Sequence, residues 1–279
     1  MSASSGLTRG DIARSLRELG LTTGDSLIVH SSMRNLGPVE GGADTVIDAI
    51  LEVIGPKGNL VLPTFNYVRP IPSPYFDPTT TACRTGILPE IGRKRPEAVR
   101  SLHPTHSVAV IGPDAGRLTE GHLSQRVFGV GSPVDLLAQS GGKVLLLGVG
   151  QTSNSTIHVA EEHAGMPKGS WYEELPVVRI RRPDGTFLSH QMDTSCSCSA
   201  AFEAAEYGLR RHGEIRDARI GGVCRLMLGR DVIRRVGEMI REQPDILLCR
   251  WEHCAPCTKA RRRLAAGGLL PAPARGPAD

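Results

Sequence analysis

The order of apolar runs between residues 26 and 62 constrains the fold of this chain more than any other feature of its sequence. Residues 26–29 form a short apolar run, residues 43–54 carry apolar side chains at helical spacing, and residues 60–62 form a second apolar run. A strand, a helix and a second strand in this order are typical of a βαβ unit, whose two strands lie parallel in one sheet. The run therefore predicts an α/β fold with a parallel sheet.

Four more segments are predicted to be strands. Residues 108–111 and 143–148 are apolar runs, and the second of them, KVLLLG, is the strongest strand candidate in the chain. Residues 177–181 and 187–191 flank the sequence Pro183-Asp184-Gly185, which is typical of an antiparallel hairpin. Residues 66–87 are rich in Pro and Thr and are expected to form a long surface loop. The sequence thus predicts a hairpin in addition to the parallel strands.

The length of the chain and its last residues indicate how it is divided. A chain of 279 residues is long enough for one large core, and we expect a single domain over residues 1–264. Residues 199–211 and 231–243 are predicted to be its closing helices. Residues 265–279 are rich in Ala, Gly and Pro, which predicts a disordered tail. The basic residues 259–263 are interpreted as part of a solvated segment before it.

Composition excludes several classes of protein. Hydrophobic residues make up 40% and charged residues 22% of the chain, which argues against disorder. No apolar run approaches the roughly 18–20 residues that a membrane span needs, and the N-terminus lacks the apolar segment of a signal peptide. We therefore expect a cytoplasmic protein with no membrane partner. The net charge of +4 is carried largely by residues after 208, and no recognition helix or aromatic platform accompanies it, so no nucleic-acid partner is expected.

His158 is the first candidate for chemistry. It lies in the sequence NSTIHVAEEHA, directly after the strand candidate at 143–148, and the carboxyl ends of strands are where open α/β sheets bind ligands. Glu161 and Glu162 follow it at i+3 and i+4, so a carboxylate can reach the imidazole and hold the tautomer that a general base needs. The same spacing is common on solvated helices, and by itself it favours an incidental histidine.

Two further segments end predicted strands with polar residues. In HPTHSV, the side chains of His106 and Ser107 are expected to line the mouth of a strand rather than bind a metal. In VHSSMRNLGPVEGG, backbone N–H groups, hydroxyls and Arg34 suit a phosphate or a pantetheine chain. This segment matches neither the P-loop nor the dinucleotide-binding pattern, so it predicts an anion site of no specific class.

Five of the seven cysteines form two groups. Cys196 and Cys198 are separated by one residue, and Cys249, Cys254 and Cys257 follow near the C-terminus. In a reducing compartment such spacing indicates metal binding more often than a disulfide. We expect a structural zinc site formed by Cys196 or Cys198 with the other three, which would hold the C-terminal region on the core. Reduced free thiols are an equally weighted alternative.

Several long motifs occur in order along the chain and resemble one family. They include HSSMRNLGPVEGGADTVIDAILEVIGPKGNLVLPTF, FDPTTTACRTGILPE, HPTHSVAVIGP and GKVLLLGVGQTSNSTIHVAE. Together they resemble the aminoglycoside 3-N-acetyltransferase (antibiotic N-acetyltransferase) family over roughly residues 8–240. The resemblance implies an α/β fold with a mixed central sheet flanked by helices, unlike the GNAT fold. It also implies acetyl transfer from acetyl-CoA to an amine in a ternary complex, without a metal in the reaction.

The resemblance also implies roles for individual residues. His158 would be the general base and Glu161 its polarising partner, while Glu162 and Asp193 would contribute acidic groups to the acceptor pocket. The acetyl-CoA site, or its junction with the amine, would be lined by His30, Ser31, Ser32, Arg34, Gly37, His106 and Ser107. The expected partners are acetyl-CoA and a small-molecule amine, with the protein a monomer or a homodimer.

Three other functions compete with this interpretation. A biosynthetic or detoxifying N-acyltransferase would use the same chemistry on a different amine. A hydrolase or acyltransferase with a cysteine nucleophile would use Cys83, Cys196 or Cys198. A zinc-knuckle protein that binds nucleic acid would use residues 249–263, but this explains only a small part of a core-forming chain.

Overall fold

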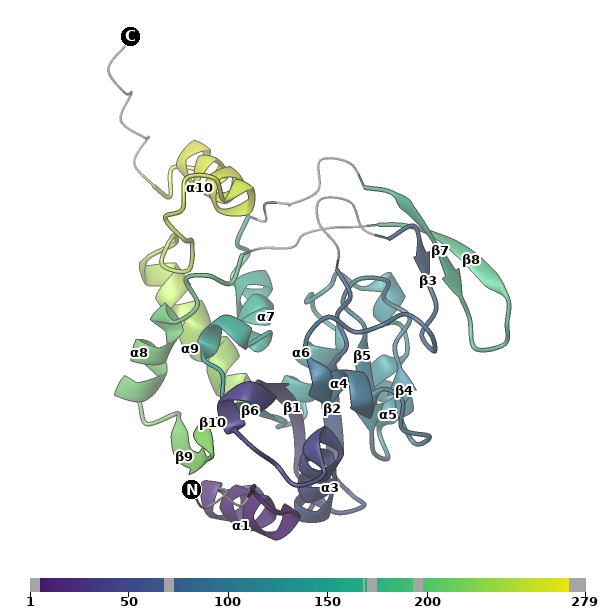
Figure 1. Cartoon of the computed structure of the whole chain (residues 1–279). Coiled ribbons are helices and arrows are strands. Elements are labelled where there is room, and N and C mark those ends of the chain that lie inside the picture. Colours follow the sequence, from purple (N-terminus) through teal and green to yellow (C-terminus); the bar gives the residue numbers. More distant parts are fainter. Residues whose placement is uncertain (1–5, 68–72, 168, 170–174, 193–197, 271–279) are drawn as a thin grey trace.

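Seven strands form one mixed sheet at the centre of the computed structural model, which describes residues 6–67, 73–167, 169, 175–192 and 198–270 (Figure 1). Their order across the sheet is β4 (Val99–Arg100), β5 (Val108–Ile111), β2 (Asn59–Pro63), β1 (Ser26–Ser31), β6 (Lys143–Leu147), β10 (Gly222–Leu228) and β9 (Arg216–Ile220). Ten helices are described: α1 (Arg9–Leu19), α2 (Met33–Leu36), α3 (Gly42–Ile54), α4 (Ile87–Gly92), α5 (Ala115–Thr119), α6 (Pro133–Gln139), α7 (Thr156–His163), α8 (Ala204–Arg211), α9 (Gly229–Glu242) and α10 (Ala255–Ala266).

The three central strands are parallel, as the order of apolar runs predicts. β1 pairs with β2 on one side and with β6 on the other, and helix α3 makes the crossover from β1 to β2. β5 is antiparallel to β2, and β10 is antiparallel to β6, so the outer strands make the sheet mixed. The α/β fold with a mixed central sheet flanked by helices is therefore confirmed.

Helices cover both faces of this sheet because its central strands are apolar on both sides. Leu27 and Val29 of β1 face the core that contains α1 and α3, whereas Ile28 faces the core that contains α6, α7 and α9. All three side chains are completely buried. Strands buried on both faces read as continuous apolar runs, which is why β1, β2 and β6 are recognisable in the sequence.

A second, three-stranded sheet projects to one side of the central sheet (Figure 1). It contains β3 (Tyr75–Phe76), β7 (Val177–Arg181) and β8 (Phe187–Gln191), and β7 and β8 form the hairpin that the sequence predicts. Its own core is small and includes Phe76, Val178 and Ile180. The segment expected to be a long loop before residue 87 thus contributes a strand to this sheet.

The C-terminal region differs from its prediction. Residues 259–263 lie in helix α10, in which Ala260 and Leu264 are buried while Lys259, Arg262 and Arg263 are exposed, so they form the solvated face of a helix and not part of a tail. The basic side chains concealed this helix, because only a narrow stripe of it is apolar. Helix α10 ends at Ala266, two residues beyond the expected domain limit, and residues 271–279 of the predicted tail lie outside the described residues. Helix α8 begins at Ala204, five residues later than predicted.

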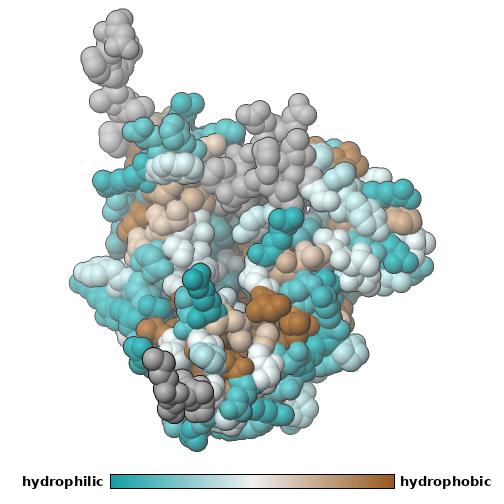
Figure 2. Space-filling model, viewed as in Figure 1, coloured by the Kyte–Doolittle hydropathy of each residue, from teal (hydrophilic) through white to brown (hydrophobic). Residues whose placement is uncertain are grey.

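No helix in the described part of the chain combines the length and the apolar character needed to cross a membrane. On the face shown in Figure 2, hydrophilic side chains cover most of the surface and apolar groups form small separate areas.

Candidate active site

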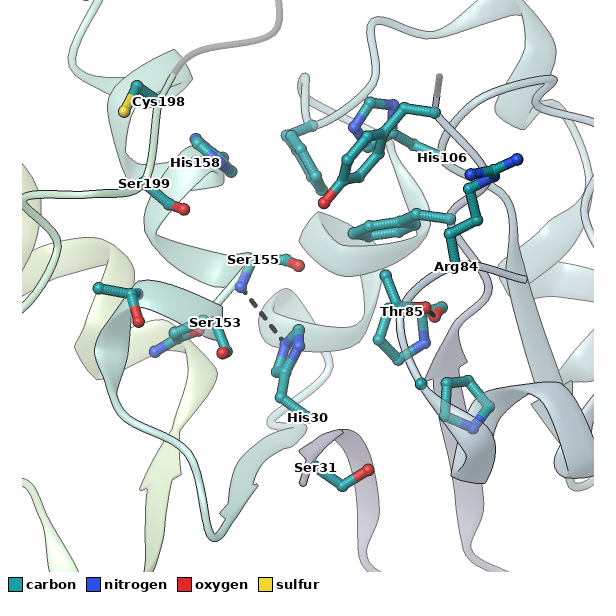
Figure 3. Close-up of a pocket in the computed structure, with 18 of the residues that line it drawn as sticks. His30, Ser31, Arg84, Thr85, His106, Ser153, Ser155, His158, Cys198 and Ser199 are labelled. Atoms are coloured by element: carbon teal, nitrogen blue, oxygen red, sulfur yellow. Dashed lines mark hydrogen bonds between the residues drawn. The ribbon is translucent and has the colours of Figure 1, made fainter. Parts of the chain in front are cut away.

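A cavity of about 750 Å³ lies at the carboxyl ends of β1 and β6. His30 and Ser31 at the end of β1 form part of its floor, and residues 152–155, which connect β6 to α7, form the adjoining wall. Figure 3 shows His158, Ser199 and Cys198 on one side of the cavity and His106 and Arg84 on the other. The site therefore occupies the edge of the sheet at which α/β folds bind ligands.

His158 and Glu161 form a hydrogen-bonded pair in the wall of this cavity. The Nδ1 atom of His158 lies 2.8 Å from the Oε2 atom of Glu161. Glu161 is 1% exposed and His158 is 9% exposed, so the pair is buried at the edge of the cavity. A carboxylate at Nδ1 favours the tautomer with its proton on Nδ1 and a lone pair on Nε2, which is the form a general base uses.

Two phenylalanine rings fix the plane of the His158 imidazole. Phe128 stacks on it with a centroid distance of 4.9 Å and an interplanar angle of 20°, and Phe202 meets it edge-on at 4.6 Å. Both rings belong to the core beneath α7. With its orientation set by packing and by Glu161, the imidazole is preorganised for proton transfer.

His30 is a second histidine of the cavity, but its environment gives it a different character. Its Nε2 atom accepts a hydrogen bond of 3.3 Å from the backbone N–H of Ser155, which requires a lone pair on that nitrogen (Figure 3). Burial lowers the pKa of His30 to about 3, because the interior disfavours the imidazolium. His30 is therefore neutral, and it ties the end of β1 to the start of α7.

The opposite side of the cavity is aromatic. His106 is stacked on Tyr67 at 5.4 Å, and Phe65 and Phe128 lie against the same imidazole at 4.9 and 5.4 Å. The Nδ1 atom of His106 is 2.9 Å from the hydroxyl of Thr105. This side thus offers flat apolar faces with one imidazole among them.

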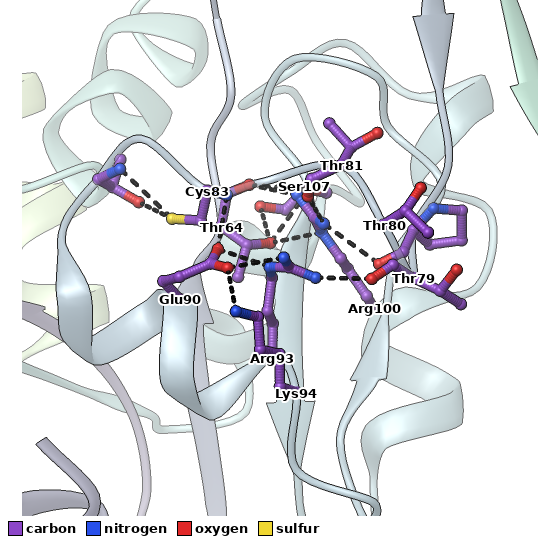
Figure 4. Close-up of polar contacts among 12 residues, drawn as sticks. Thr64, Thr79, Thr80, Thr81, Cys83, Glu90, Arg93, Lys94, Arg100 and Ser107 are labelled. Carbon is purple, nitrogen blue, oxygen red and sulfur yellow. Dashed lines mark hydrogen bonds and ion pairs between the residues drawn. The ribbon is translucent and has the colours of Figure 1, made fainter.

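A buried network holds the loop that brings Arg84 and Thr85 to the cavity (Figure 4). The guanidinium of Arg100 donates to the carbonyls of Thr81, Pro78 and Thr64 at 2.5, 3.2 and 2.9 Å. Burial lowers the pKa of Arg100 to about 10. A neighbouring ion pair joins Arg93 to Glu90, whose carboxylate also accepts the backbone N–H of Cys83 at 2.7 Å. The loop is therefore tied to the core on both sides of Ala82.

Four thiols gather beside the cavity. The Sγ atoms of Cys198, Cys249, Cys254 and Cys257 all lie within 4.8 Å of one another, and we call this group the thiol cluster. Cys249, Cys254 and Cys257 are buried, whereas Cys198 is partly exposed and lines the cavity. Hydrogen bonds from its neighbours, chiefly Cys257, lower the pKa of the Cys198 thiol to about 5. Four cysteines so close together could hold a metal ion, and their number and type match those of a tetrahedral structural zinc site.

The comparison with known families decides what kind of site this is. The model of the aminoglycoside 3-N-acetyltransferase family matches residues 28–241, which include the carboxyl end of β1 and all of β6 and α7. The chain belongs to this family.

Individual acetyltransferases of the family are similar to the chain over most of its length. Aminoglycoside N(3)-acetyltransferase III of a Salmonella species is 37% identical over 193 residues, which are 61% of this chain and 66% of that protein. The match thus spans slightly less than two thirds of that relative. Aminoglycoside N(3)-acetyltransferase IV, also of a Salmonella species, is 30% identical over 243 residues, which are 86% of this chain and 90% of that protein.

Solved structures share the fold. The apoenzyme of aminoglycoside acetyltransferase AAC(3)-IVa has a TM-score of 0.79 at 28% identity, and the match covers 94% of this chain and 99% of the chain of that enzyme. A histidine-to-alanine mutant of that enzyme in complex with a gentamicin has a TM-score of 0.79 at 29% identity, with the same coverage of both chains. The binary complex of AAC-IIIb with CoASH has a TM-score of 0.73 at 26% identity and covers 86% of this chain and 98% of its own.

The structure brings together some of the residues that the resemblance to this acetyltransferase family indicated. His30, Ser31, His106 and His158 line one cavity, and Glu161 lies directly behind His158. These residues come from β1, the segment before β5, and α7, so the sheet assembles them from three parts of the chain.

Other indicated residues lie away from the cavity lining. Ser107 is fully buried and bonds to Thr64 and Arg100 within the network of Figure 4. The Ser32 hydroxyl caps α2 by accepting the N–H of Asn35 at 3.3 Å, and Arg34 and Gly37 belong to the same short helix and its end. Their proposed contact with acetyl-CoA thus needs a ligand that extends beyond this cavity.

The two acidic residues indicated for the acceptor pocket are not both described. Glu162 forms an ion pair of 3.1 Å with Arg126 and is not among the residues that line the cavity. Asp193 and Cys196 lie outside the described residues. Cys198, one of the two cysteines considered for the first zinc ligand, lies in the thiol cluster.

Several residues of the cavity carry no local signal in the sequence. Arg84, Ser199 and Trp251 all line it, together with residues that are far away from them in sequence. The thiol motif of residues 249–257 does surround Trp251, and it is the one pattern that could have indicated this residue.

Proposed function

We propose that this chain transfers the acetyl group of acetyl-CoA to the 3-amino group of an aminoglycoside, with His158 as general base. The observation that carries the proposal is the hydrogen bond between His158 and the buried carboxylate of Glu161 in the cavity wall. Relatives named as aminoglycoside N(3)-acetyltransferases, and solved complexes of similar enzymes with CoASH and with a gentamicin, support the choice of substrates. We propose the cytoplasm as the place of the reaction, because acetyl-CoA is supplied there.

The proposed reaction begins with removal of a proton from the acceptor. An ammonium group must lose a proton before its nitrogen can attack a thioester, and the Nε2 atom of His158 takes that proton. Glu161 then stabilises the imidazolium through Nδ1. The nitrogen bonds to the acetyl carbon and loses a second proton to solvent, the carbon–sulfur bond breaks, and the CoA sulfur leaves and takes the proton held on Nε2 of His158, which restores the neutral base. Hydroxyls of Ser31, Ser155 and Ser199 line the cavity and are donors available to the oxyanion.

A different amine is the second candidate for the acceptor, and the charges around the cavity favour it. Among the described residues of the lining, Arg84 is cationic and none is Asp or Glu. Aminoglycosides carry several positive charges, which clustered carboxylates bind best. An N-acyltransferase that acts on a less charged amine would suit the described lining better.

An assay of CoA release tests the acetyl transfer. Purified enzyme would be supplied with acetyl-CoA and a panel of aminoglycosides and simpler amines. His158→Ala should lower kcat by about 10²- to 10⁴-fold, the usual contribution of a general base. His163→Ala is the matched control, because His163 lies on the same helix but bonds to Asp135 outside the cavity, and its kcat should stay within about twofold. Equal activity of the His158 variant and the wild type would exclude the proposed base, and the preferred amine would decide between the two acceptors.

We also propose that the thiol cluster binds one structural zinc ion. Four sulfur atoms within 4.8 Å of one another match the four-cysteine ligand set, and the backbone N–H of Ala200 donates to the sulfur of Cys198 at 3.4 Å, as is usual for a thiolate ligand. The ion would hold the fold and take no part in the transfer of the acetyl group. Elemental analysis of purified protein should find about one zinc per chain, and a value near zero after expression with added zinc would refute the site.

A further inference from the structure

The thiol cluster joins two distant segments at one wall of the cavity. Cys198 lines the cavity together with the next two residues, Ser199 and Ala200. Trp251 also lines it and stands in the chain between the ligand candidates Cys249 and Cys254. The cluster therefore lies directly behind the part of the wall that adjoins His158, as the positions of Cys198, Ser199 and His158 in Figure 3 show.

We propose that zinc in the thiol cluster positions the wall of the acetyl-transfer site, and that Trp251, held by this zinc knuckle, is a contact for the ring of a bound substrate. This inference rests on the zinc site and the acetyl transfer proposed above. It assigns a function in substrate binding to a metal that takes no part in the chemistry.

In the described part of the chain, the segment that carries Trp251 is held by the burial of its cysteines and by a small number of hydrogen bonds. Residues 249–253 form no helix or strand, and a turn bond from the Cys254 N–H to the Trp251 carbonyl is their main internal contact. The guanidinium of Arg261 donates to the carbonyls of Leu248 and Cys249 at 2.7 and 2.8 Å. Four metal–sulfur bonds would fix the position of this loop, which has no helix or strand of its own.

The surroundings of the cluster suit a charged metal–thiolate centre. Zinc with four thiolates carries a net charge of −2, and Lys259, Arg261, Arg262 and Arg263 follow its last ligand on α10. Arg261 reaches the backbone of the cluster itself. The guanidinium of Arg261 therefore lies beside the segment that carries Cys249, where a negative metal–thiolate centre would be favoured.

Trp251 has the features of a ligand contact. It is 60% exposed although it is among the largest apolar side chains, and its exposed indole borders the cavity. The Trp251 ring lies edge-on to the ring of His253, with 6.0 Å between the two centroids. One side of the indole therefore packs against its own segment of the chain. A flat apolar face in this position suits a planar or ring-shaped group of a substrate, either the adenine of acetyl-CoA or a ring of the acceptor.

Substitution of Trp251 tests the contact. Trp251→Ala should raise the KM of one substrate roughly three- to tenfold with kcat changed less than about twofold, the size expected for one lost aromatic contact. Separate titrations of acetyl-CoA and of the acceptor identify which ring is bound. Trp251→Phe should recover most of the loss, and zinc content should be that of the wild type. No change in either KM would overturn the assigned contact.

Removal of the metal tests the positioning. Removal of zinc from the wild-type protein with a chelator should raise the same KM that Trp251→Ala raises. Added zinc should return this KM to its original value. In Trp251→Ala protein the chelator should have little further effect on that KM, because the contact is already lost. Circular dichroism at each step confirms that the protein stays folded.

A cysteine substitution gives an independent test. Cys257→Ser should lower zinc content and raise the same KM, whereas Cys224→Ser, at a buried cysteine on β10 outside the cluster, should change neither. Should Cys257→Ser fail to fold, the chelator series still decides.

The outcomes separate the three proposals. Protein without zinc would refute the zinc site, and zinc-loaded protein that releases no CoA with any amine would refute the acetyl transfer. Active, zinc-containing protein whose KM values survive complete removal of the metal would overturn the positioning role alone.

Discussion

Glu161 lies one helical turn beyond His158, and its Oε2 atom is 2.8 Å from the imidazole Nδ1 although its side chain has almost no contact with solvent. A carboxylate in this place is withdrawn from solvent and lies in hydrogen-bonding contact with the imidazole. In the reaction proposed above, it holds the proton on Nδ1 and compensates the charge of the imidazolium.

We expect Glu161→Gln to lower kcat by about 10²- to 10⁴-fold, because an amide can donate to Nδ1 and stabilise the wrong tautomer. KM for acetyl-CoA should change little. Glu161→Asp keeps the charge but shortens the reach, so its kcat should lie between that of the Gln variant and that of the wild type. Steady-state kinetics of the three proteins checks the order, and a Gln variant as active as the wild type would contradict it.

Stability should decrease in mild acid because of histidines that are buried in neutral form. Burial lowers the pKa of His30 to about 3 and that of His122 to about 4, and burial together with neighbouring histidines also lowers the pKa of His103. In the unfolded chain a histidine takes up its proton near pH 6.5. The free energy of unfolding is therefore highest above pH 6.5 and decreases as the pH falls from 6.5 toward 4. The decrease is about 2 kcal/mol per histidine at pH 5.

Urea denaturation at pH 7, 6 and 5 measures this loss. His122→Asn should reduce the dependence of the unfolding free energy on pH, because His122 bonds to Ser101 and Val127 in the interior and belongs to no proposed catalytic group. An unchanged dependence in this variant would show that His122 is protonated in the folded state.

Gly221→Ala should destabilise the protein strongly. Gly221 has a φ of 70° in the turn between β9 and β10, and a Cβ atom there would collide with the carbonyl group of Leu36 at the end of α2. Both partners are backbone, so neither can move aside cheaply. Gly185→Ala is the matched control, because Gly185 also has a positive φ (83°) in a hairpin turn but faces open space. We expect a loss of roughly 1 kcal/mol for the control and at least twice that for Gly221→Ala, measured by urea denaturation.

Arg100→Met should cost about 3 kcal/mol or more in unfolding free energy. The substitution keeps the apolar stem but leaves the carbonyls of Pro78 and Thr81 without the guanidinium donor, and it removes one of two side-chain donors to the carbonyl of Thr64, which keeps the Ser107 hydroxyl. Arg9→Ala is the control, since Arg9 pairs with Glu52 at the surface and should contribute no more than about 0.5 kcal/mol. Equal losses in the two variants would contradict the structural role of the Arg100 network.

The central strands could be predicted from the sequence, and the edge of the sheet could not. β1, β2 and β6 are buried on both faces and therefore stand out as apolar runs. β9 has the sequence RDARI and is largely exposed, so nothing in its composition distinguishes it from a loop. Its pairing with β10 depends on a turn at Gly221 that fits only against α2, which is a tertiary constraint.

The candidate site shows the same division. The i, i+3 spacing of His158 and Glu161 is common on solvated helices, and what distinguishes this pair is burial beneath Phe128 and Phe202, which are distant in sequence. The cysteine spacing indicated a metal site but could not choose between Cys196 and Cys198. The position of Cys198 in the wall of the cavity is set by the path of the chain, which spacing alone does not reveal.

The wall that carries Trp251 is the last part of the cavity to be synthesised. A nascent chain that has reached the end of β10 already contains every strand of the central sheet and the His158–Glu161 pair, yet it lacks three of the four thiols and the indole. Because domains tend to acquire structure from the N-terminus during translation, the catalytic pair would be in place before the substrate-holding wall. If the thiol cluster binds zinc as proposed, the affinity for substrate would reach its final value only when the completed chain captures the metal.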